Sequence, residues 1–293
     1  MSLLSNLFGK KEEQQTLTAN AQIEKPLAMS VLFSKTLDIN QKALEKELRA
    51  FDAGMSAAVC HLDDKKRAEG FTISLCGWKN HVVRIMGTKS PMPAEALEPC
   101  VSGAHYPLAL KEQARKHQSH VLLYYVGYET DPLEQYVALA AVAGALSKFG
   151  GFMAVNESAH TSFPAEALAE SINNRMELLH IMPLMYLYIG FVKYNVENVE
   201  GVWMRTHGAY KFNIPDLAFH AAGHSESQKI LDLFSNVIQY LLESKAKLLP
   251  GNTMQIEEET FMRLRKPQED EGFLESKGEI LVVELINKSQ INH

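Results

Sequence analysis

Short apolar runs recur along most of the chain and predict a series of strands. Within residues 81–87, Val82, Arg84 and Met86 alternate with Val83 and Ile85, the period of two that puts successive side chains on opposite faces of a sheet. Residues 184–192 form an apolar run that predicts a buried strand bearing two tyrosines. The predicted strands cover residues 28–34, 56–62, 71–76, 81–87, 121–126, 152–155, 184–192, 201–204, 217–221 and 279–286, and residues 254–265 alternate in part.

Helical spacing is clearest after residue 225. Ser225-Glu226-Ser227-Gln228 has the composition of a capping box, and apolar residues then recur on one side of a helix from Ile230 to Leu241. A second helix is predicted to begin at Asp131-Pro132 and to end at Gly150-Gly151. Its many alanines predict that it is the most enclosed helix of the fold. Further helices are predicted from Asp38 to before Gly54, over 108–117 and over 164–172.

Strands that occur both in neighbouring groups and between helices are typical of the α+β class. We therefore expect mainly antiparallel sheets with helices packed on one face. No repeat is visible at the level of residues, although two related halves fit the pattern. The predicted organisation is a flexible tail over residues 1–25, a two-lobed α+β domain over 26–256, and an acidic C-terminal segment with a final strand over 257–293, which we expect at a sheet edge.

Charge is unevenly distributed. The net charge of the chain is −6, and residues 257–284 account for −5 of it, with nine acidic and four basic residues. A nucleic-acid-binding protein needs a basic face, so the charge pattern argues against that class. The acidic segment is predicted to be a solvated surface, with the docking of a basic partner as the alternative.

Compartment and membrane association follow from three observations. Cys60, Cys76 and Cys100 form no C-x-x-C pair, which favours buried, reduced thiols. No signal-peptide layout is present, and the longest apolar runs fall short of the roughly 20 residues that span a bilayer. We expect a cytoplasmic protein. At the N-terminus, one helical face of Leu3, Leu4, Leu7 and Phe8 belongs either to a loose tail or to a docking peptide for a membrane surface or partner.

Residues 201–222 hold the densest mixture of polar and aromatic side chains. His220 and His224 have the spacing of two metal ligands on a helix, but a glycine and a predicted cap lie around them and no H-E-x-x-H follows. The chain has no G-x-S-x-G elbow, no P-loop and no G-x-G-x-x-G. We therefore predict no metal and no cofactor, and we assign no catalytic residue.

Two interpretations of the stretch from Arg205 to Asp216 stand. In the first, it is a loop tucked under Tyr210 and Phe212, in which Thr206 and Asp216 cap local backbone amides and Gly208 permits a tight turn. In the second, Arg205, His207 and Asp216 are polar anchors of a ligand in an aromatic-lined recess. The candidate binding residues are Arg205, Thr206, His207, Tyr210 and Asp216, with His120 or His220.

The same stretch resembles a known family. Leu184-Met185-Tyr186-Leu187-Tyr188, Met204-Arg205-Thr206-His207-Gly208 and Phe212-x-x-Pro215-Asp216-Leu217 resemble the bacterial DUF4261 family, as do the later helix at 230–242 and the turn Gly251-Asn252-Thr253. Asn213 and Asp216 stand where the family often has Gly and Glu. The resemblance is best over residues 180–256, and weaker over 28–160, where His120-Val-Leu-Leu resembles a strand of the family. It implies a shared fold and no reaction, since the family has no established activity.

Three functional hypotheses follow. The first is a non-enzymatic protein that binds another protein, as an immunity or accessory factor does. It is motivated by the incomplete catalytic inventory and the acidic C-terminal segment. The second is a small-ligand-binding protein or enzyme that uses the Arg205–Asp216 loop. The third is a structural component of a larger assembly.

Overall fold

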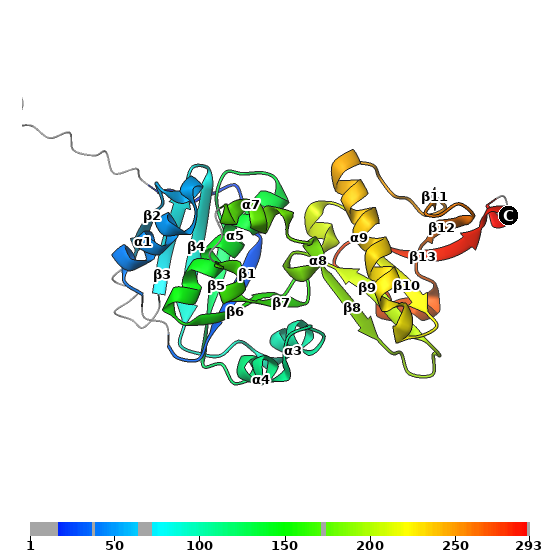
Figure 1. The fold of residues 1–293 in the computed structure, drawn as a ribbon, viewed down its shortest axis with the longest axis horizontal. Coiled ribbons are helices and arrows are strands. Elements are labelled where there is room, and N and C mark those ends of the chain that lie inside the picture. The colour runs from blue at the N-terminus through cyan, green and yellow to red at the C-terminus, as the bar shows by residue number, and fades with distance from the viewer. Residues whose placement is uncertain (1–16, 37–38, 64–71, 171–173, 292–293) are drawn as a thin grey trace, which may run out of the picture.

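The chain forms two lobes, each built on its own β-sheet (Figure 1). A computed structural model describes residues 17–36, 39–63, 72–170 and 174–291. The expected helix at Leu3 to Phe8 and the predicted start at Asp38 lie outside these residues. The described part of the N-terminal segment is attached to the first lobe, where the backbone N–H of Asn20 donates to the carbonyl of Val126 at 2.8 Å.

The first lobe holds a seven-stranded antiparallel sheet in the order β2-β3-β4-β5-β1-β6-β7. Its strands are β1 (Ala28–Phe33), β2 (Val59–Leu62), β3 (Thr72–Trp78), β4 (His81–Thr88), β5 (Ser119–Tyr125), β6 (Gly151–Asn156) and β7 (Thr161–Pro164). Its helices are α1 (Gln41–Phe51), α3 (Ala94–Ser102), α4 (Leu108–Arg115), α5 (Pro132–Leu146), α6 (Ala165–Leu168) and α7 (Arg175–Ile181).

The second lobe holds a six-stranded sheet in the order β11-β12-β13-β10-β9-β8. Its elements are α8 (Leu184–Leu187), β8 (Gly190–Tyr194), β9 (Val202–His207), β10 (Asp216–Ala221), α9 (Ser227–Ser244), β11 (Thr253–Gln255), β12 (Thr260–Arg265) and β13 (Ile280–Asn287). Strands β10 and β13 pair in parallel, and the other pairs are antiparallel. The predicted α+β class with mainly antiparallel sheets is confirmed.

The two lobes share an order of strands. In the second lobe, β10 leads through α9 to β11, β12 and β13, and β13 returns to lie parallel beside β10. In the first lobe, β1 leads through α1 to β2, β3 and β4, which runs in the direction of β1 because both are antiparallel to the intervening β5. The hairpin β6–β7 borders β1 as the hairpin β9–β8 borders β10. The two halves therefore share a spatial order of strands. They differ in chain order, because the hairpin follows β1 but precedes β10, and the first half adds α3, α4, β5 and α5.

Helix α5 is the centre of the first lobe. Every residue from Tyr136 to Leu146 is buried, as the alanine-rich sequence predicts. Asp131 caps its start by accepting from the backbone N–H of Leu133 at 2.9 Å, and Gly150 ends the segment in the left-handed region at φ 91°. A side chain at Gly144 would meet Phe51 at 2.9 Å. Small residues thus let α1 and α6 approach this helix closely.

Helices cover both faces of the first sheet, which corrects the expectation of one covered face. Val31 and Phe33 of β1 point into the large core shared with α5. Leu32, between them, points to the opposite face, where a smaller cluster contains Leu97 of α3 and Ala114 of α4. Helix α3 was not predicted, because four prolines near it indicated a linker. Pro93 in fact precedes its first turn, and Pro99 lies within the helix.

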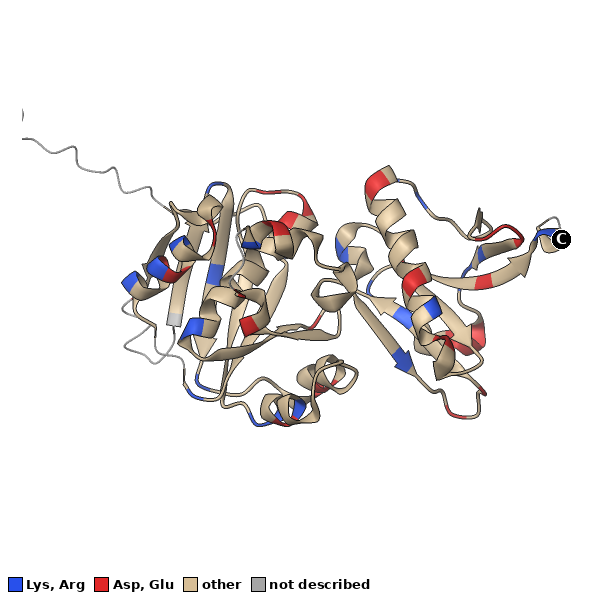
Figure 2. Ribbon diagram, viewed as in Figure 1, with Lys and Arg blue, Asp and Glu red and all other residues tan. Residues whose placement is uncertain are grey.

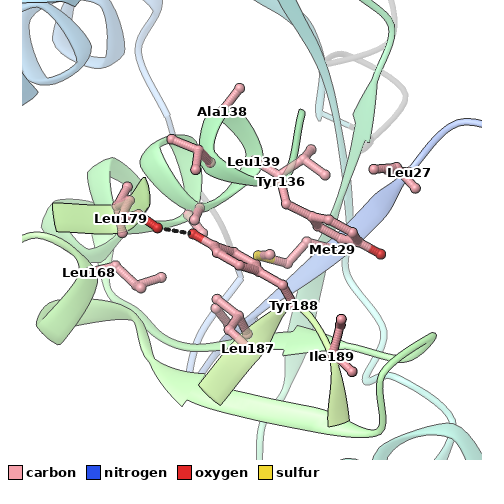
Figure 3. Packing of buried hydrophobic residues seen from close by; sticks show 14 of the residues in the cluster. Leu27, Met29, Tyr136, Ala138, Leu139, Leu168, Leu179, Leu187, Tyr188 and Ile189 are labelled. Atoms are coloured by element: carbon pink, nitrogen blue, oxygen red, sulfur yellow. Dashed lines mark hydrogen bonds between the residues drawn. The ribbon is translucent and has the colours of Figure 1, made fainter. Parts of the chain in front are cut away.

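One hydrophobic core runs through both lobes. Figure 3 shows the part of it around Tyr136 and Tyr188. The ring of Tyr136 stacks on those of Tyr188 and Phe212, with 5.6 Å between centroids in each pair. The Tyr188 hydroxyl donates to the carbonyl of Leu179 at 2.9 Å. This three-ring stack joins α5 of the first lobe to the second, so the lobes are packed together rather than only linked by the chain.

Three predicted elements differ from the structure. Residues 184–192 form a short helix and then a strand, and only Tyr188 of its two tyrosines is buried, since Tyr186 is 55% exposed. The capping box at Ser225 does not form, because Ser225 lies within the 3₁₀ helix η4 (His224–Glu226) and α9 begins only at Ser227, without a side-chain cap. The helix predicted over 164–172 is α6, which ends at Leu168, and residues 171–173 lie outside the described part.

The C-terminal acidic segment is part of the second sheet. Strand β13 lies between β12 and β10, so the expectation of an edge strand was wrong. Acidic residues gather at the β11–β12 turn and in the 3₁₀ helix η5 (Glu269–Leu274), as Figure 2 shows. Arg265 pairs with Glu271 of η5 at 2.6 Å and with Glu284 of β13 at 2.9 Å. Those ion pairs offset part of the repulsion within the segment.

Candidate functional site

Strand β9 places the candidate residues on two faces of the second sheet. Val202 and Met204 point into the main core beneath α9, whereas Trp203 belongs to a smaller cluster on the opposite face, beneath η5. Because side chains alternate along a strand, Arg205 and His207 share the face of Trp203, and Thr206 faces the core. The motif is therefore divided between the interior and the η5 side.

The buried side chain of Asp216 holds the loop in place through hydrogen bonds. Its carboxylate is fully buried and accepts from the Thr206 hydroxyl at 3.0 Å, the backbone N–H of Ala209 at 3.1 Å and the Ser276 hydroxyl at 3.0 Å. Thr206 in turn accepts from the backbone N–H of Leu217 at 2.9 Å. Burial raises the pKa of Asp216, and these hydrogen bonds act against that rise. The geometry is that of a side chain that holds β9, β10 and the loop between them in register.

Arg205 forms hydrogen bonds with the C-terminal end of η5. Its side chain is 2% exposed, and Nη1 donates to the carbonyls of Leu274 at 3.0 Å and Glu275 at 3.2 Å. A cation at the end of a helical turn satisfies carbonyls that have no partner within the turn. The second amino group, Nη2, is buried without a hydrogen-bond partner in the described protein, as are Tyr194 Oη and Trp203 Nε1 on the same face.

His207 forms a ring stack with a residue of the first lobe. Its imidazole lies 4.2 Å from that of His160, centroid to centroid, at an interplanar angle of 25°. Burial, followed by Arg205 and His160, lowers the pKa of His207 to about 3. Burial, Arg205 and Lys277 lower the pKa of His160 as well. Both rings are therefore neutral near pH 7.

The β6–β7 turn that carries His160 fits closely against two glycines of the second lobe. A Cβ on Gly190 would lie 1.6 Å from the carbonyl oxygen of Ala159, and one on Gly208 would lie 2.9 Å from that of Ser158. Gly208 has φ 91°, which confirms the predicted tight turn. His160 itself has φ 52°, a conformation that non-glycine residues seldom adopt outside functional or tightly constrained sites.

The remaining candidates do not join this group. His120 lies on β5 of the first sheet, where Nδ1 donates to the carbonyl of Ser90 at 2.9 Å. His220 donates to the carbonyl of Glu200 at 2.7 Å and stacks on Trp203 at 4.8 Å. Tyr210 is half-buried with Lys211 over its ring at 5.3 Å. Within the described residues, no group of three or more His, Cys, Asp or Glu is arranged to hold a metal ion.

Two hollows adjoin these residues. A groove of about 840 Å³ lies between parts of the two lobes and is lined largely by apolar side chains, among them Leu133, Ile181, Met182, Leu184, Ile214 and Leu242. A smaller cavity of about 390 Å³ lies beside His160 and Lys277, with Glu95 and Glu157 also in its wall. His160 and Lys277 were not predicted as site residues. His160 lies more than forty positions before β9, and Lys277 follows η5. No local sequence pattern marks a contact between residues so far apart in the chain.

One segment of the chain matches a known family. It contains the stacked His207, the buried Asp216 and most of the central strand β13. Residues 205–284 match the family model described as "Domain of unknown function (DUF4261)". The predicted resemblance is confirmed over this DUF4261 segment. No curated protein and no solved structure matches the chain.

The limits of the DUF4261 segment differ from the expected 180–256. It begins at Arg205 on β9 and ends at Glu284 on β13, so it includes all nine acidic residues of 257–284 and leaves out α8 and β8. Strand β13 supplies the parallel neighbour of β10, which explains why the segment extends beyond 256. In the described part of the chain, no helix has the length and apolar content needed to cross a membrane.

Proposed function

We propose that this protein acts in the cytoplasm by binding another protein in the groove between its lobes, as an accessory or immunity factor does. The observation that carries the proposal is the groove itself, the largest hollow among those described, with mainly apolar walls contributed by both lobes. Apolar surface left open to solvent at a concave site favours the docking of a partner.

The occupant that fits best is a short apolar segment of the partner. Ile181 is 67% exposed on the groove wall, and Leu133, Leu184 and Leu242 are half-buried around it. The charged wall residues are few and mixed in sign: Asp131 and Glu243 against Lys245 and Lys247. A partner segment therefore gains most from leucine-like side chains in the groove, with charges only at its ends.

The hydrogen bonds of the Arg205–Asp216 loop also support binding in the groove over a reaction at the loop. Two of the three anchors considered there are Arg205 and Asp216. Both form their hydrogen bonds with backbone groups and hydroxyls of the second lobe. A group that contacts a ligand must reach it, and Asp216 is fully buried. We infer that the loop shapes the lobe and that contact with a partner takes place in the groove.

Site-specific photocrosslinking in the native host tests the proposal. A photoreactive residue is placed at position 181 or 242 in the groove, and at position 199 as the control, since Val199 is an exposed apolar residue outside the groove. The same partner captured from both groove positions, and lost on Ile181→Asp, is the expected result. Equal capture at all three positions overturns the proposal. Crosslinks to a second copy of the chain overturn it in favour of self-association.

A small ligand beside the Arg205–Asp216 loop is the second candidate, favoured by the cavity at His160. The wall of that cavity contains Lys277 together with Glu95 and Glu157, so a small zwitterion would find an opposite charge for each of its ends. A thermal-shift screen with amino acids and related zwitterions tests it, because a ligand that binds only the folded state raises Tm. The shift should disappear in Lys277→Met. A flat screen removes this candidate and leaves the groove proposal standing.

A further inference from the structure

Two of the three cysteines lie directly opposite each other on neighbouring strands. Cys60 of β2 is the register partner of Cys76 of β3, and their sulfur atoms are 2.7 Å apart. Both side chains are fully buried in the core beneath α1. We propose that Cys60 and Cys76 are a redox-active pair, which a small disulfide oxidant such as oxidised glutathione converts to an intramolecular disulfide.

The backbone geometry suits this bond. Directly opposed residues of an antiparallel pair have Cα atoms about 4.5 to 5.5 Å apart, and disulfides are found with Cα separations of about 4.4 to 6.8 Å. The strands therefore need not move apart or slide for the bond to form. Cys100 offers an internal contrast: it lies on α3 in a different cluster, with its thiol near the carbonyls of Ala96 and Asn156.

The position of β2 provides access. It is a four-residue strand at the edge of the first sheet, paired with β3 alone among the described strands. Short edge elements open locally far more often than the whole protein unfolds. The hydrogen bond to Cys76 and burial both raise the pKa of the Cys60 thiol, so the closed state holds little thiolate. Oxidation therefore proceeds through the opened hairpin and is slow.

The reaction is a pair of thiol–disulfide exchanges. One cysteine loses its proton and attacks a sulfur of the oxidant; the oxidant's S–S bond breaks, and one small thiol leaves with that proton. The second cysteine then loses its proton and attacks the mixed disulfide, so that the Cys60–Cys76 bond forms and the second small thiol leaves. The protein loses two protons and two electrons, and the oxidant gains them. Excess dithiothreitol reverses both steps.

The test uses the intact chain. Protein incubated with oxidised glutathione is denatured and alkylated with N-ethylmaleimide, and intact mass and disulfide-linked peptides are measured. We expect one alkylated thiol, at Cys100, and a linked peptide pair containing Cys60 and Cys76. Three alkylated thiols after prolonged incubation, a stable glutathione adduct, or a link that involves Cys100 overturns the proposal.

Thermal unfolding gives a second readout. A bond that closes a loop of about 15 residues should raise Tm by about 5 °C or more, and dithiothreitol should cancel the rise. Cys100→Ser should keep both the bond and the shift, and Cys60→Ser should lose both. The wild-type peptide map decides the matter even where Cys60→Ser folds poorly. An oxidised protein whose Tm is unchanged, with no linked peptide, contradicts the pairing.

Discussion

The imidazole of His207 stacks on that of His160, with 4.2 Å between the ring centroids. His207 ends strand β9 of the second sheet, and His160 sits in the β6–β7 turn of the first. The contact therefore joins the DUF4261 segment to the other lobe through two groups that can each take up a proton. Nearby Arg205 and Lys277 oppose that uptake.

This stack predicts a loss of stability in acid. The pKa of His207 is lowered from 6.5 to about 3, so between these values the unfolded chain binds a proton that the folded protein does not. Its contribution is complete above pH 6.5 and falls as pH drops toward 3, by on the order of 1 kcal/mol per pH unit. Urea unfolding at several pH values measures it. His207→Phe, which keeps a ring against His160, should show a shallower dependence, and parallel curves for the two proteins would refute the assignment.

Gly190→Ala should loosen the contact between the lobes. The new methyl group would lie 1.6 Å from the carbonyl oxygen of Ala159, so the β6–β7 turn must move. We expect a loss of about 3 kcal/mol in the free energy of unfolding, measured with urea. Gly223→Ala is the matched control, because nothing lies within 4 Å of its added Cβ and its φ is −175°. Equal effects of the two substitutions would show that the close approach is unimportant.

Substitution of Asp216 should separate the charge from the hydrogen bonds. Asp216→Ala leaves the Ala209 N–H, the Thr206 hydroxyl and the Ser276 hydroxyl without their acceptor, and we expect a loss of about 3 kcal/mol. Asp216→Asn keeps an oxygen for Thr206 and Ala209, so about 1 kcal/mol is expected. Chemical denaturation of both variants measures the difference. An Asn variant as damaging as the Ala variant would mean that the negative charge itself is required.

The three-ring stack predicts where the two lobes are coupled. Tyr136→Ala removes the ring between Tyr188 and Phe212 and should cost about 3 to 5 kcal/mol. Scanning calorimetry should also show the single transition broadening or splitting, because the lobes lose shared core. Tyr240→Ala serves as the control, since that tyrosine is 48% exposed on α9. A uniform shift of one sharp transition would argue against a coupling role for the stack.

Local pattern was sufficient for most elements of the fold. Helix α5 was predicted from its Asp131-Pro132 start, alanine-rich body and Gly150-Gly151 end, and β4 from its alternation, since both depend on neighbours in sequence. The prediction of a single strand over 184–192 is wrong, because a strand and a helix can both bury such an apolar run. Pro183 and the packing of Tyr188 beneath Tyr136 produce a helical turn there.

The site depended on contacts that local pattern does not contain. Thr206, Gly208 and Asp216 were recognisable as residues that shape backbone, and the first interpretation of the loop describes what they do. The pairing of His207 with His160 spans two lobes, and the central place of β13 depends on a parallel partner more than sixty residues earlier. Acidic residues around β13 indicated an exposed edge, whereas Arg263 and Arg265 from β12 bind Glu284 across the strand pair.

The parallel pairing of β10 and β13 also determines how the DUF4261 segment is joined to the rest of the chain. Ala218 of β10 is the register partner of Arg205 on one side and of Val282 on the other. The segment therefore begins on β9 and ends on β13, the two strands that flank β10. These two strands are about 10 Å apart at the usual strand spacing. A unit with adjacent entry and exit can be spliced into a host polypeptide without disturbing the host's own chain path. In this chain the first half of β9 leads into the segment and the last residues of β13 lead out of it, on either side of β10.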